Sequence, residues 1–391
     1  MGSGRIREGG LIVGIDATRN RSGGAKGHLI GMLAEGDPLK HGIKEVHVWA
    51  YKTLLDALPK RPWLVPHNPP AIEQSLLKQV WWQWFHLQDE LKAAGCAIAL
   101  NTDAGTVSRF RPAVTMSRDM LSYEPGEMNR FGLSKARARL TLLRYLQNRS
   151  FRRSDGVVFL TRYAARIIQQ SAGKLSRLAI IPHGVGPTFS KTNADQPWLV
   201  DGPIRCVYVS NVALYKHQWV VVQAIADLRR RGGHNLQLVL VGQGPGSGAI
   251  KAQRLLDKAI ATYDSRPTFI SQTGFIPNEK LASLLASAHL FIFASSCENM
   301  PNTLVEAMAV GLPIACSDRG PMPEVLKNGG VYFDPENAES IADAVEQIIK
   351  DSSLRISIAR QAKVLSEQYS WARCAAETWE FLRTTAERDK R

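Results

Sequence analysis

The amino-acid sequence predicts an α/β protein with two doubly wound domains, each built on a parallel sheet that helices cover on both faces. Short apolar runs alternate with amphipathic helical segments along most of the chain, and such alternation is typical of β-α-β units. The runs are apolar at nearly every position, as strands buried on both faces are. The length of 391 residues exceeds what one core usually serves and suits two domains of roughly 200 residues.

The expected strands fall into two series, one in each half of the chain. Those of the first half are LIVGID (11–16), EVHVWA (45–50), AIAL (97–100), AVTM (113–116), GVVFL (156–160) and LAIIP (178–182). Those of the second half are IRCVYV (204–209), LQLVLV (236–241), PTFI (267–270), HLFIF (289–293) and PIACS (313–317). Helices are expected between the strands, for example over 217–232 and 278–288, and again from about residue 337 to the end of the chain.

The polar stretch 190–203 separates the two series of strands. It contains two prolines and shows no hydrophobic periodicity, which indicates a boundary between domains. We therefore expect an N-terminal domain over 1–195, a C-terminal domain over 196–370 and a final helix over 371–391 that is long enough to pack back on the N-terminal domain. Charge changes at the same place: residues 1–200 hold 28 Lys and Arg against 15 Asp and Glu, a net +13 that leaves only +1 of the total +14 for the rest.

The composition favours a globular protein of the cytoplasm. Charged residues make up 21% and hydrophobic residues 45% of the chain, which is atypical of a disordered protein. No apolar run approaches the length of about 18 residues that a membrane span needs, and the first residues lack the apolar core of a signal peptide. The five cysteines lie far apart, are odd in number and lack metal-ligand spacing, which predicts reduced and mostly buried thiols.

Residues 297–318, CENMPNTLVEAMAVGLPIACSD, combine a short polar turn, an apolar helix and a strand. We expect the helix to begin with Asn302 as its N-cap and to end at Gly311. The helix then starts at the carboxyl edge of a parallel sheet, where doubly wound folds bind ligands. Free backbone amides over 302–304, helped by the helix dipole, predict a site for a phosphate group.

Two glutamates flank this predicted phosphate site. Glu306 lies one turn into the helix and Glu298 lies before the turn, so each can point away from the phosphate. A ligand with a diphosphate in its middle and polyols at both ends uses all three features, because each carboxylate accepts hydrogen bonds from hydroxyl groups. A nucleotide-sugar is such a ligand.

The spacing Glu298-x7-Glu306 within ENMPNTLVEAMAVGLP closely resembles the E-x7-E signature of retaining GT-B glycosyltransferases of family 4 (group 1), of the type that assembles bacterial polysaccharide and O-antigen. A lone E-x7-E is common, so the surrounding residues and further segments carry the weight. Those segments are SGGAKGHL (22–29), FLTRYAARII (159–168), IIPHGV (180–185), SNVALYKHQ (210–218), VGQGPG (241–246) and GFIPNEKLASLLASAHLFIFAS (274–295). The resemblance covers about residues 10–375 and implies a GT-B fold, in which two doubly wound Rossmann-like domains face each other across a cleft.

The resemblance also implies roles for named residues. Lys216 holds the diphosphate, Glu306 binds the ribose hydroxyls, and Glu298 contacts the donor sugar and shapes the transition state. The N-terminal glycine loop faces the donor diphosphate. The candidate donor-binding residues are therefore Gly23, Gly24, Asn211, Lys216, Asn302, Thr303, Leu304 and Glu306.

Two departures from the family pattern affect the expected chemistry. Asn211 stands where the family often has an arginine, and Ser-Arg-Asp (117–119) stands near the family's usual histidine of the first domain. We expect Arg118 to add positive charge, which makes it a third catalytic candidate beside Glu298 and Lys216. No general base is assigned, because the leaving diphosphate oxygen can take the acceptor proton on the same face. Metal ligands of the D-x-D type are not evident, so no metal ion or other cofactor is expected to be required.

The first half of the chain contains a strongly basic segment. Residues 130–177 hold twelve Lys and Arg and a single acid, Asp155, and 132–155 form a basic amphipathic helix. Part of the apolar face is expected to pack on its own sheet, but the lack of acids predicts attraction to anionic lipid headgroups, by about 1 kcal/mol per basic group near the surface. For the aromatic run 79–87 (QVWWQWFHL), packing in the core is favoured over a role at a membrane interface.

These features predict an enzyme, a retaining, hexosyltransferase-like glycosyltransferase that moves a sugar from a nucleotide-diphosphate donor to a hydroxyl of a glycan. The expected acceptor is a lipid-linked or lipopolysaccharide glycan, in the biosynthesis of O-antigen, capsule or exopolysaccharide. The basic N-terminal domain predicts contact with an anionic membrane, and hence a peripheral location on the inner face of the cytoplasmic membrane.

Other functions fit parts of the sequence. A sugar phosphorylase or a nucleotide-sugar epimerase with the same double fold is the nearest alternative. GPGSGA (244–249) follows a strand and fits the dinucleotide pattern G-x-G-x-x-A, but no acidic residue ends a strand about 20 residues later, which makes a dehydrogenase a weak match. The net charge of +14 suggests nucleic-acid binding, yet no nucleic-acid motif is present and no nucleic acid is expected as a partner.

Overall fold

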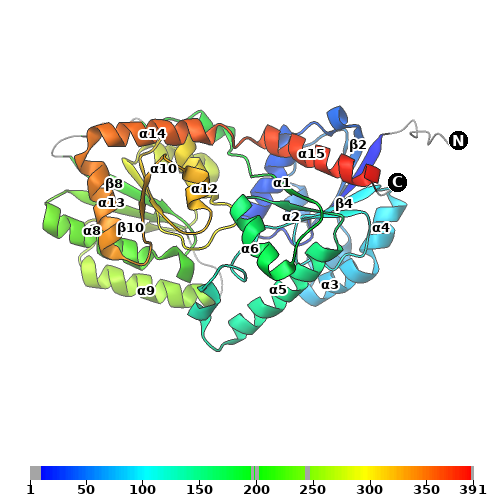
Figure 1. Ribbon diagram of the computed structural model, residues 1–391, viewed down its shortest axis with the longest axis horizontal. Helices are drawn as coiled ribbons and strands as arrows, with labels where there is room; N and C mark the ends of the chain where they lie inside the picture. Colours follow the sequence, from blue (N-terminus) through cyan, green and yellow to red (C-terminus); the bar gives the residue numbers. More distant parts are fainter. Residues whose placement is uncertain (1–9, 195–197, 199–201, 243–246, 389–391) are drawn as a thin grey trace. The chain divides into compact units, whose positions relative to one another are not determined.

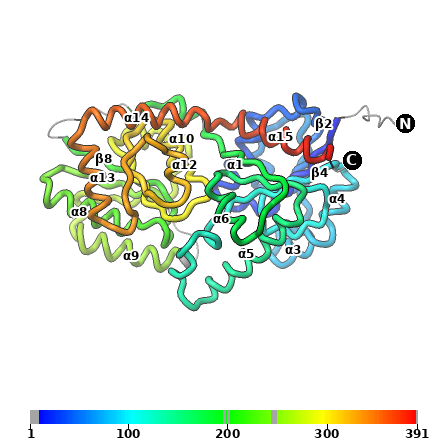
Figure 2. Tube along the Cα trace, in the orientation of Figure 1, coloured from blue at the N-terminus to red at the C-terminus, as the bar shows by residue number. Residues whose placement is uncertain are grey.

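The computed structural model describes residues 10–194, 198, 202–242 and 247–388, and the chain divides into two compact units (Figures 1 and 2). The first unit comprises Met1–Tyr123, Ala138–Gly184 and Ser370–Arg391, and the second comprises Glu124–Arg137 and Val185–Tyr369. Two features differ from the expected domain limits. The main division lies at 184/185 instead of 195/196, and a short segment of the N-terminal half belongs to the second unit.

The first unit is built around a seven-stranded parallel sheet with the order β3-β2-β1-β4-β5-β6-β7. Its strands are β1 (Leu11–Asp16), β2 (Ile43–Trp49), β3 (Leu64–His67), β4 (Ile98–Asn101), β5 (Ala113–Met116), β6 (Gly156–Phe159) and β7 (Leu178–Ile180). All but β3 fall on expected runs. The sequence does not reveal β3 because it is short and contains Pro66, which a sheet tolerates in an edge strand such as this one.

The second unit has a six-stranded parallel sheet with the order β10-β9-β8-β11-β12-β13. Its strands are β8 (Ile204–Val209), β9 (Leu236–Val241), β10 (Ile270–Thr273), β11 (Leu290–Phe293), β12 (Ile314–Ser317) and β13 (Val331–Phe333). The expected run 267–270 overlaps β10 only at Ile270, where the strand begins. Just before the strand, the Asp264 carboxylate accepts hydrogen bonds from the amides of Thr268, Phe269 and Ile270 and holds the chain in a turn. The three residues of β13 are too few to stand out in the sequence.

The helices follow the strands in the alternation that the sequence predicts. They are α1 (Gly23–Glu35), α2 (Lys52–Leu55), α3 (Leu76–Phe85), α4 (Leu87–Ala93), α5 (Lys135–Arg153), α6 (Arg162–Ala172), α7 (Pro187–Ser190), α8 (Gln218–Gly232), α9 (Ser247–Tyr263), α10 (Asn278–Ala286), α11 (Asn302–Val310), α12 (Met322–Leu326), α13 (Ala338–Lys350), α14 (Ser352–Ser366) and α15 (Trp371–Arg388). Short 3₁₀ helices are η1 (Pro38–His41), η2 (Pro70–Glu73), η3 (Glu127–Phe131) and η4 (Leu214–Lys216).

The last helix, α15, belongs to the first unit and packs against α1. Figure 2 shows this red end of the chain beside the blue beginning. Trp379 of α15 is fully buried, and Trp371 lies so close to Gly31 of α1 that a Cβ there would come within 2.4 Å of the indole ring. A glycine at position 31 is therefore a condition for this packing, because a larger side chain would occupy the place of the ring.

Strands β8 and β11 are neighbours in the second sheet, although β9 and β10 lie between them in the chain. The chain builds β9 and β10 on one side of β8 and then returns to build β11, β12 and β13 on the other. The order of the strands thus reverses between β8 and β11. In doubly wound folds, the carboxyl ends of the strands at such a point form the place where ligands bind.

Candidate functional site

An ion pair lies at the carboxyl ends of β8 and β11. Lys216, in η4 after β8, donates a hydrogen bond from Nζ to Oε1 of Glu298, which follows β11. The side chains of Lys216 and Glu298 are only 8% and 15% exposed. Lys216 Nζ also lies 5.2 Å from the ring centroid of Tyr215 and 5.5 Å from that of Phe293. Each buried charge is therefore compensated by the other, which such burial requires.

The backbone around Lys216 is held from two sides. The Tyr208 hydroxyl donates a hydrogen bond of 2.8 Å to the carbonyl oxygen of Lys216. The next residue, His217, has a left-handed backbone with φ of 48°, and its Nε2 lies 2.9 Å from Ser296 Oγ. Burial, and next the positive charge of Arg130, lower the pKa of His217 to about 4, so the imidazole is neutral at physiological pH.

Helix α11 starts beside this pair, and its N-terminus differs in two respects from the expectation. Pro301 is the N-cap and Asn302 the first helical residue, and no side chain caps the helix. The amides of Asn302 and Leu304 are not free, because they donate to the carbonyl oxygens of Met300 and Pro301 at 3.0 and 3.1 Å in a tight first turn. The N-terminal dipole remains. The C-terminus is as expected, since Gly311 ends the helix with φ of 84°.

Thr303 and Glu306 occupy different environments on α11. Thr303 Oγ1 donates to the carbonyl oxygen of Val209 at 3.0 Å and thereby fixes the start of α11 to the end of β8. Glu306 Oε2 is buried and has no hydrogen-bond partner among the described residues. Burial raises the pKa of Glu306 to about 8. A buried acceptor without a partner is costly, so a ligand hydroxyl at this place would gain a strong interaction.

The loops after β8 and β9 approach each other closely. Gly242, which follows β9, has φ of 127°, and a Cβ there would lie 2.1 Å from the carbonyl oxygen of Ser210. Only glycine allows this approach. Asn211 is exposed beside it. Residues 243–246 of the segment VGQGPG lie outside the described residues, as does part of GPGSGA.

The remaining predicted residues lie in the first unit. Gly23 and Gly24 are the first residues of α1 and are exposed. Ser22 is the N-cap and accepts a hydrogen bond of 3.3 Å from the amide of Ala25, and no acidic residue lies in the first turn. A Cβ on Gly23 would meet no atom within 4 Å. This helix start is therefore open and favourable for an anion.

Arg118 follows β5 and is partly buried. Its Nη2 donates to Asn20 Oδ1 at 2.8 Å, whereas its buried Nη1 has no hydrogen-bond partner among the described residues. Burial lowers the pKa of Arg118 to about 10, which leaves the guanidinium charged at neutral pH. The Nη1 group of Arg118 could therefore donate a hydrogen bond to an anion.

Two histidines near Arg118 were not singled out from the sequence. His28 of α1 stacks on His183 with ring centroids 4.6 Å apart. Burial, and then the charges of His183 and Arg118, lower the pKa of His28 well below its usual value. Both lie in segments that carry the family resemblance, SGGAKGHL and IIPHGV, so their position in those motifs was the available signal.

The structure brings Lys216, Glu298, Thr303 and Glu306 to one edge of the second sheet, whereas Gly23, Gly24 and Arg118 belong to the first unit. In the described part of the chain, no cluster of three or more His, Cys, Asp or Glu side chains could hold a metal ion. Within the same residues, every helix is too short or too polar to cross a membrane. All five cysteines are buried, and none of them forms a disulfide.

Part of the second unit is similar to a known protein family. Residues 190–364 match the family described as glycosyl transferases group 1. The O-antigen chain mannosyltransferase B of Escherichia coli is 31% identical over 114 residues, which is 29% of this chain and 30% of that relative. The chain spans 30% to 54% of the length of the first three curated relatives, so it matches about half of each or less.

Solved structures resemble the chain over nearly its whole length. Sucrose-phosphate synthase from Thermosynechococcus elongatus has a TM-score of 0.76 and 16% identity, and the match covers 96% of this chain and 98% of that one. HepE of Anabaena, solved in complex with UDP-glucose, has a TM-score of 0.69 and 17% identity, with coverage of 96% and 100%. The likeness confirms the predicted fold, two parallel-sheet Rossmann-like α/β domains of the GT-B type.

Proposed function

We propose that this protein is a retaining glycosyltransferase that moves a sugar from a nucleotide-diphosphate-sugar to a hydroxyl of a glycan. The observation that carries the proposal is the group of Lys216, Glu298 and Glu306 around the start of α11. In this group, the buried cation and the helix dipole suit the diphosphate of such a donor, and the two carboxylates suit the hydroxyls of its ribose and its sugar. The family match of the same segment and the UDP-glucose bound to HepE agree with this ligand class.

Each part of the donor has a proposed partner in the second unit. Lys216 has three N–H donors, so its ammonium can keep its hydrogen bond to Glu298 and also donate to a phosphate oxygen. The start of α11 attracts the same diphosphate through its dipole. Glu306 accepts hydrogen bonds from ribose hydroxyls at its unpartnered Oε2. Glu298 contacts the donor sugar, and exposed Asn211 adds a polar group beside the diphosphate.

The proposed reaction keeps the configuration at the anomeric carbon. The bond from that carbon to the β-phosphate oxygen breaks, and a bond to the acceptor oxygen forms on the same face. The acceptor proton goes to the departing phosphate oxygen, so a separate general base is not needed. Lys216 stabilises the developing negative charge. Arg118 and the start of α1 at Gly23 and Gly24 give the first unit a positive potential of its own. We propose that neither a metal ion nor another cofactor takes part.

The acceptor is proposed to be a lipid-linked or lipopolysaccharide glycan, in the assembly of a cell-surface polysaccharide. The name of the E. coli relative, an O-antigen chain mannosyltransferase, supports this class. In this proposal, the N-terminal domain binds the acceptor and the C-terminal domain binds the donor. A hexose is the expected sugar.

Contact with an anionic membrane is proposed through α3 and α5 of the first unit. Leu77, Trp81 and Phe85 follow each other at i, i+4 and i+8 on α3 and are all exposed, Leu77 by 82%. The two helices lie side by side (Figure 1), and Arg149 of α5 lies over the ring of Trp84 at 5.7 Å. Exposed aromatic side chains beside cations are typical of segments that bind at the surface of a bilayer.

Helix α5 adds the charge to this surface. Its exposed face carries Arg139, Leu142, Tyr145 and Arg152, whereas Leu140 and Phe151 are buried. The sequence-based preference for core packing of the aromatic run is therefore right for Trp82, which is buried, and wrong for Trp81 and Phe85. The reason is that the run makes a complete helical turn, so its rings point to opposite sides.

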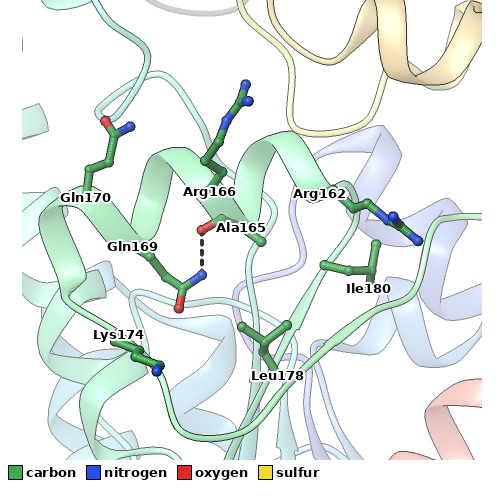
Figure 3. Close-up of a pocket in the computed structure, with 8 residues that line it drawn as sticks. All are labelled: Arg162, Ala165, Arg166, Gln169, Gln170, Lys174, Leu178 and Ile180. Carbon is green, nitrogen blue, oxygen red and sulfur yellow. Dashed lines mark hydrogen bonds between the residues drawn. The ribbon is translucent and has the colours of Figure 1, made fainter.

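The first unit also contains a pocket of about 730 Å³, which lies between α6 and the edge strand β7 (Figure 3). Arg162, Arg166 and Lys174 line it together with apolar Leu178 and Ile180, and no acidic side chain is among its described lining residues. Cations above an apolar floor suit a phosphate that is attached to a hydrocarbon chain. The pocket thus supports a lipid-linked acceptor or a phospholipid as a partner of the first unit.

Product analysis tests the proposed function directly. The protein is incubated with UDP- and GDP-sugars, with and without a lipid-linked oligosaccharide. We expect nucleoside diphosphate to be released only when the acceptor is present, together with a lengthened glycan of retained configuration. A changed sugar nucleotide without acceptor would indicate an epimerase, and sugar phosphate formed with inorganic phosphate would indicate a phosphorylase.

A further inference from the structure

A buried hydrogen-bond network connects the two loops that carry Lys216 and Glu298. Ser296 lies two residues before Glu298, and its Oγ is 2.9 Å from Nε2 of His217, the residue after Lys216. The same hydroxyl donates to Glu127 Oε1 at 2.6 Å. His217, Glu127 and Ser296 are all buried.

Glu127 comes from a distant part of the sequence. It opens η3, in the segment Glu124–Arg137 that belongs to the second unit although the stretches before and after it belong to the first. Arg130 Nε donates to Glu127 Oε2 at 2.8 Å, and Arg130 Nη2 donates to Glu336 Oε1 at 2.8 Å. Arg130 thus compensates the charge of the buried Glu127 carboxylate. Through Glu336, it also connects the segment to the turn that precedes α13.

The geometry points to a positioning role: we propose that Glu127, through the Ser296 hydroxyl, fixes the relative position of the loops that present Lys216 and Glu298 to the sugar donor. The proposal rests on the proposed function of that site. The proposal also goes beyond that function, because Glu127 lies outside the group 1 match at 190–364 and is given a role in positioning the residues of the donor site.

The physical reason is the direction of one proton. A serine hydroxyl has a single hydrogen, and with this hydrogen directed at Glu127 the lone pairs of Ser296 Oγ are available to His217 Nε2–H. Without the carboxylate, the hydroxyl can turn to the Tyr215 carbonyl oxygen, which lies 3.3 Å away, and this rotation changes the direction of its lone pairs relative to His217 Nε2. His217 has an unfavourable left-handed backbone, so a weaker bond at its ring allows the adjacent Lys216 to move.

This alternative acceptor also makes the experiment feasible. Because Ser296 can keep one hydrogen bond in the absence of Glu127, and Arg130 can keep Glu336, a Glu127 variant is expected to fold. A merely structural carboxylate would change the melting temperature and weaken all ligands alike. A positioning residue instead weakens specifically the binding of the phosphates that Lys216 contacts.

The test compares a nucleoside diphosphate with its nucleoside. Calorimetry measures the Kd of UDP, or of GDP if the wild type prefers it, and competition measures that of uridine or guanosine. We expect Glu127→Ala and Ser296→Ala each to weaken the diphosphate about tenfold and the nucleoside less than twofold. The double variant should be no weaker than either single one, because both remove the same link. The matched control is Glu377→Gln, which removes the partner of Arg373 on α15 and should change neither Kd.

Three outcomes would overturn the inference, and they are distinguishable. Diphosphate binding within twofold of the wild type in both single variants refutes the role of Glu127 and leaves the proposed function standing. Equal loss of nucleoside and diphosphate, with a lower melting temperature, shows a structural role only. A wild-type protein that binds no nucleoside diphosphate removes the proposed function, and the inference with it.

Discussion

Lys216 Nζ donates a hydrogen bond to Glu298 Oε1 across the ends of two adjacent strands, β8 and β11. This pair explains how a carboxylate can stand beside a site for an anion. The ammonium neutralises the nearest carboxylate and still has two N–H groups for a phosphate. Removing one partner would leave the other buried and uncompensated, which is strongly destabilising in general. The pair is therefore the part of the proposed site that mutations should affect most clearly.

Glu298→Ala should abolish sugar transfer in a protein that still folds, although its melting temperature should fall because Lys216 loses its partner. Loss of a group that stabilises the transition state costs about a hundredfold or more in kcat. The measurement is the initial rate of acceptor glycosylation, with circular dichroism and melting temperature as controls for folding. Turnover at the wild-type rate would contradict the role given to Glu298.

Glu306→Ala should remove the preference of the protein for ribose. If Glu306 accepts hydrogen bonds from the ribose hydroxyls, the wild type should bind a nucleoside diphosphate up to about tenfold more tightly than its 2′-deoxy form, which is within the range of one hydrogen bond. The variant should bind both with similar affinity. Equal affinity for the two nucleotides in the wild type would place the ribose elsewhere.

A second substitution, Glu306→Gln, should change the dependence of stability on pH. Burial raises the folded-state pKa of Glu306 from an ordinary value of 4.5 to about 8. A raised pKa contributes stability that is fully present below about pH 4.5 and is lost as the pH rises to about 8, by at most about 1.4 kcal/mol per pH unit. Glu306→Gln avoids this loss. Its melting temperature relative to the wild type should therefore increase between pH 5 and 8 and stay constant above, and a difference that is flat over that window would refute the burial of an uncompensated acid.

The surface of α3 and α5 should bind anionic vesicles. Leu77, Trp81 and Phe85 of α3, all changed to Ser, should lose co-sedimentation with vesicles that contain anionic phospholipid, and neutral vesicles should bind the wild type poorly. The control is Phe275→Ser, which removes an exposed aromatic side chain of the second unit. Binding that survives the triple substitution, or that is equal for neutral vesicles, would exclude this surface as the contact.

Transfer should continue in the presence of a chelator. The proposed site uses Lys216 and the N-terminus of α11 for the charge of the diphosphate, and these groups are alternatives to a bridging cation. The rate with EDTA should therefore equal the rate without it. A loss that added Mg²⁺ or Mn²⁺ restores would show that a metal ion takes part.

Much of the fold could be predicted because parallel strands that are buried on both faces have continuous apolar sequences. The missing strands, β3 and β13, are an edge strand with a proline and a strand of three residues, and neither leaves such a run. The segment Glu124–Arg137 could not be assigned to the second unit, because its membership depends on ion pairs to Glu336 and a hydrogen bond to Ser296 that are distant in sequence.

The candidate site shows the same division between local and distant information. Glu298, Glu306 and Lys216 could be named because they lie in motifs with fixed local spacing. The burial of Glu306, the pairing of Lys216 with Glu298 and the left-handed His217 depend on how loops of separate strands meet. The occupied amides of Asn302 and Leu304 depend on the tight turn at Pro301, which the N-cap preference of asparagine does not reveal.

A crystal structure with a bound nucleotide-sugar tests the central claim most directly. We expect the diphosphate within hydrogen-bond distance of Lys216 Nζ at the start of α11, the ribose hydroxyls at Glu306 and the sugar at Glu298. A diphosphate bound away from the ends of β8 and β11 would contradict the proposed donor site and the mechanism derived from it.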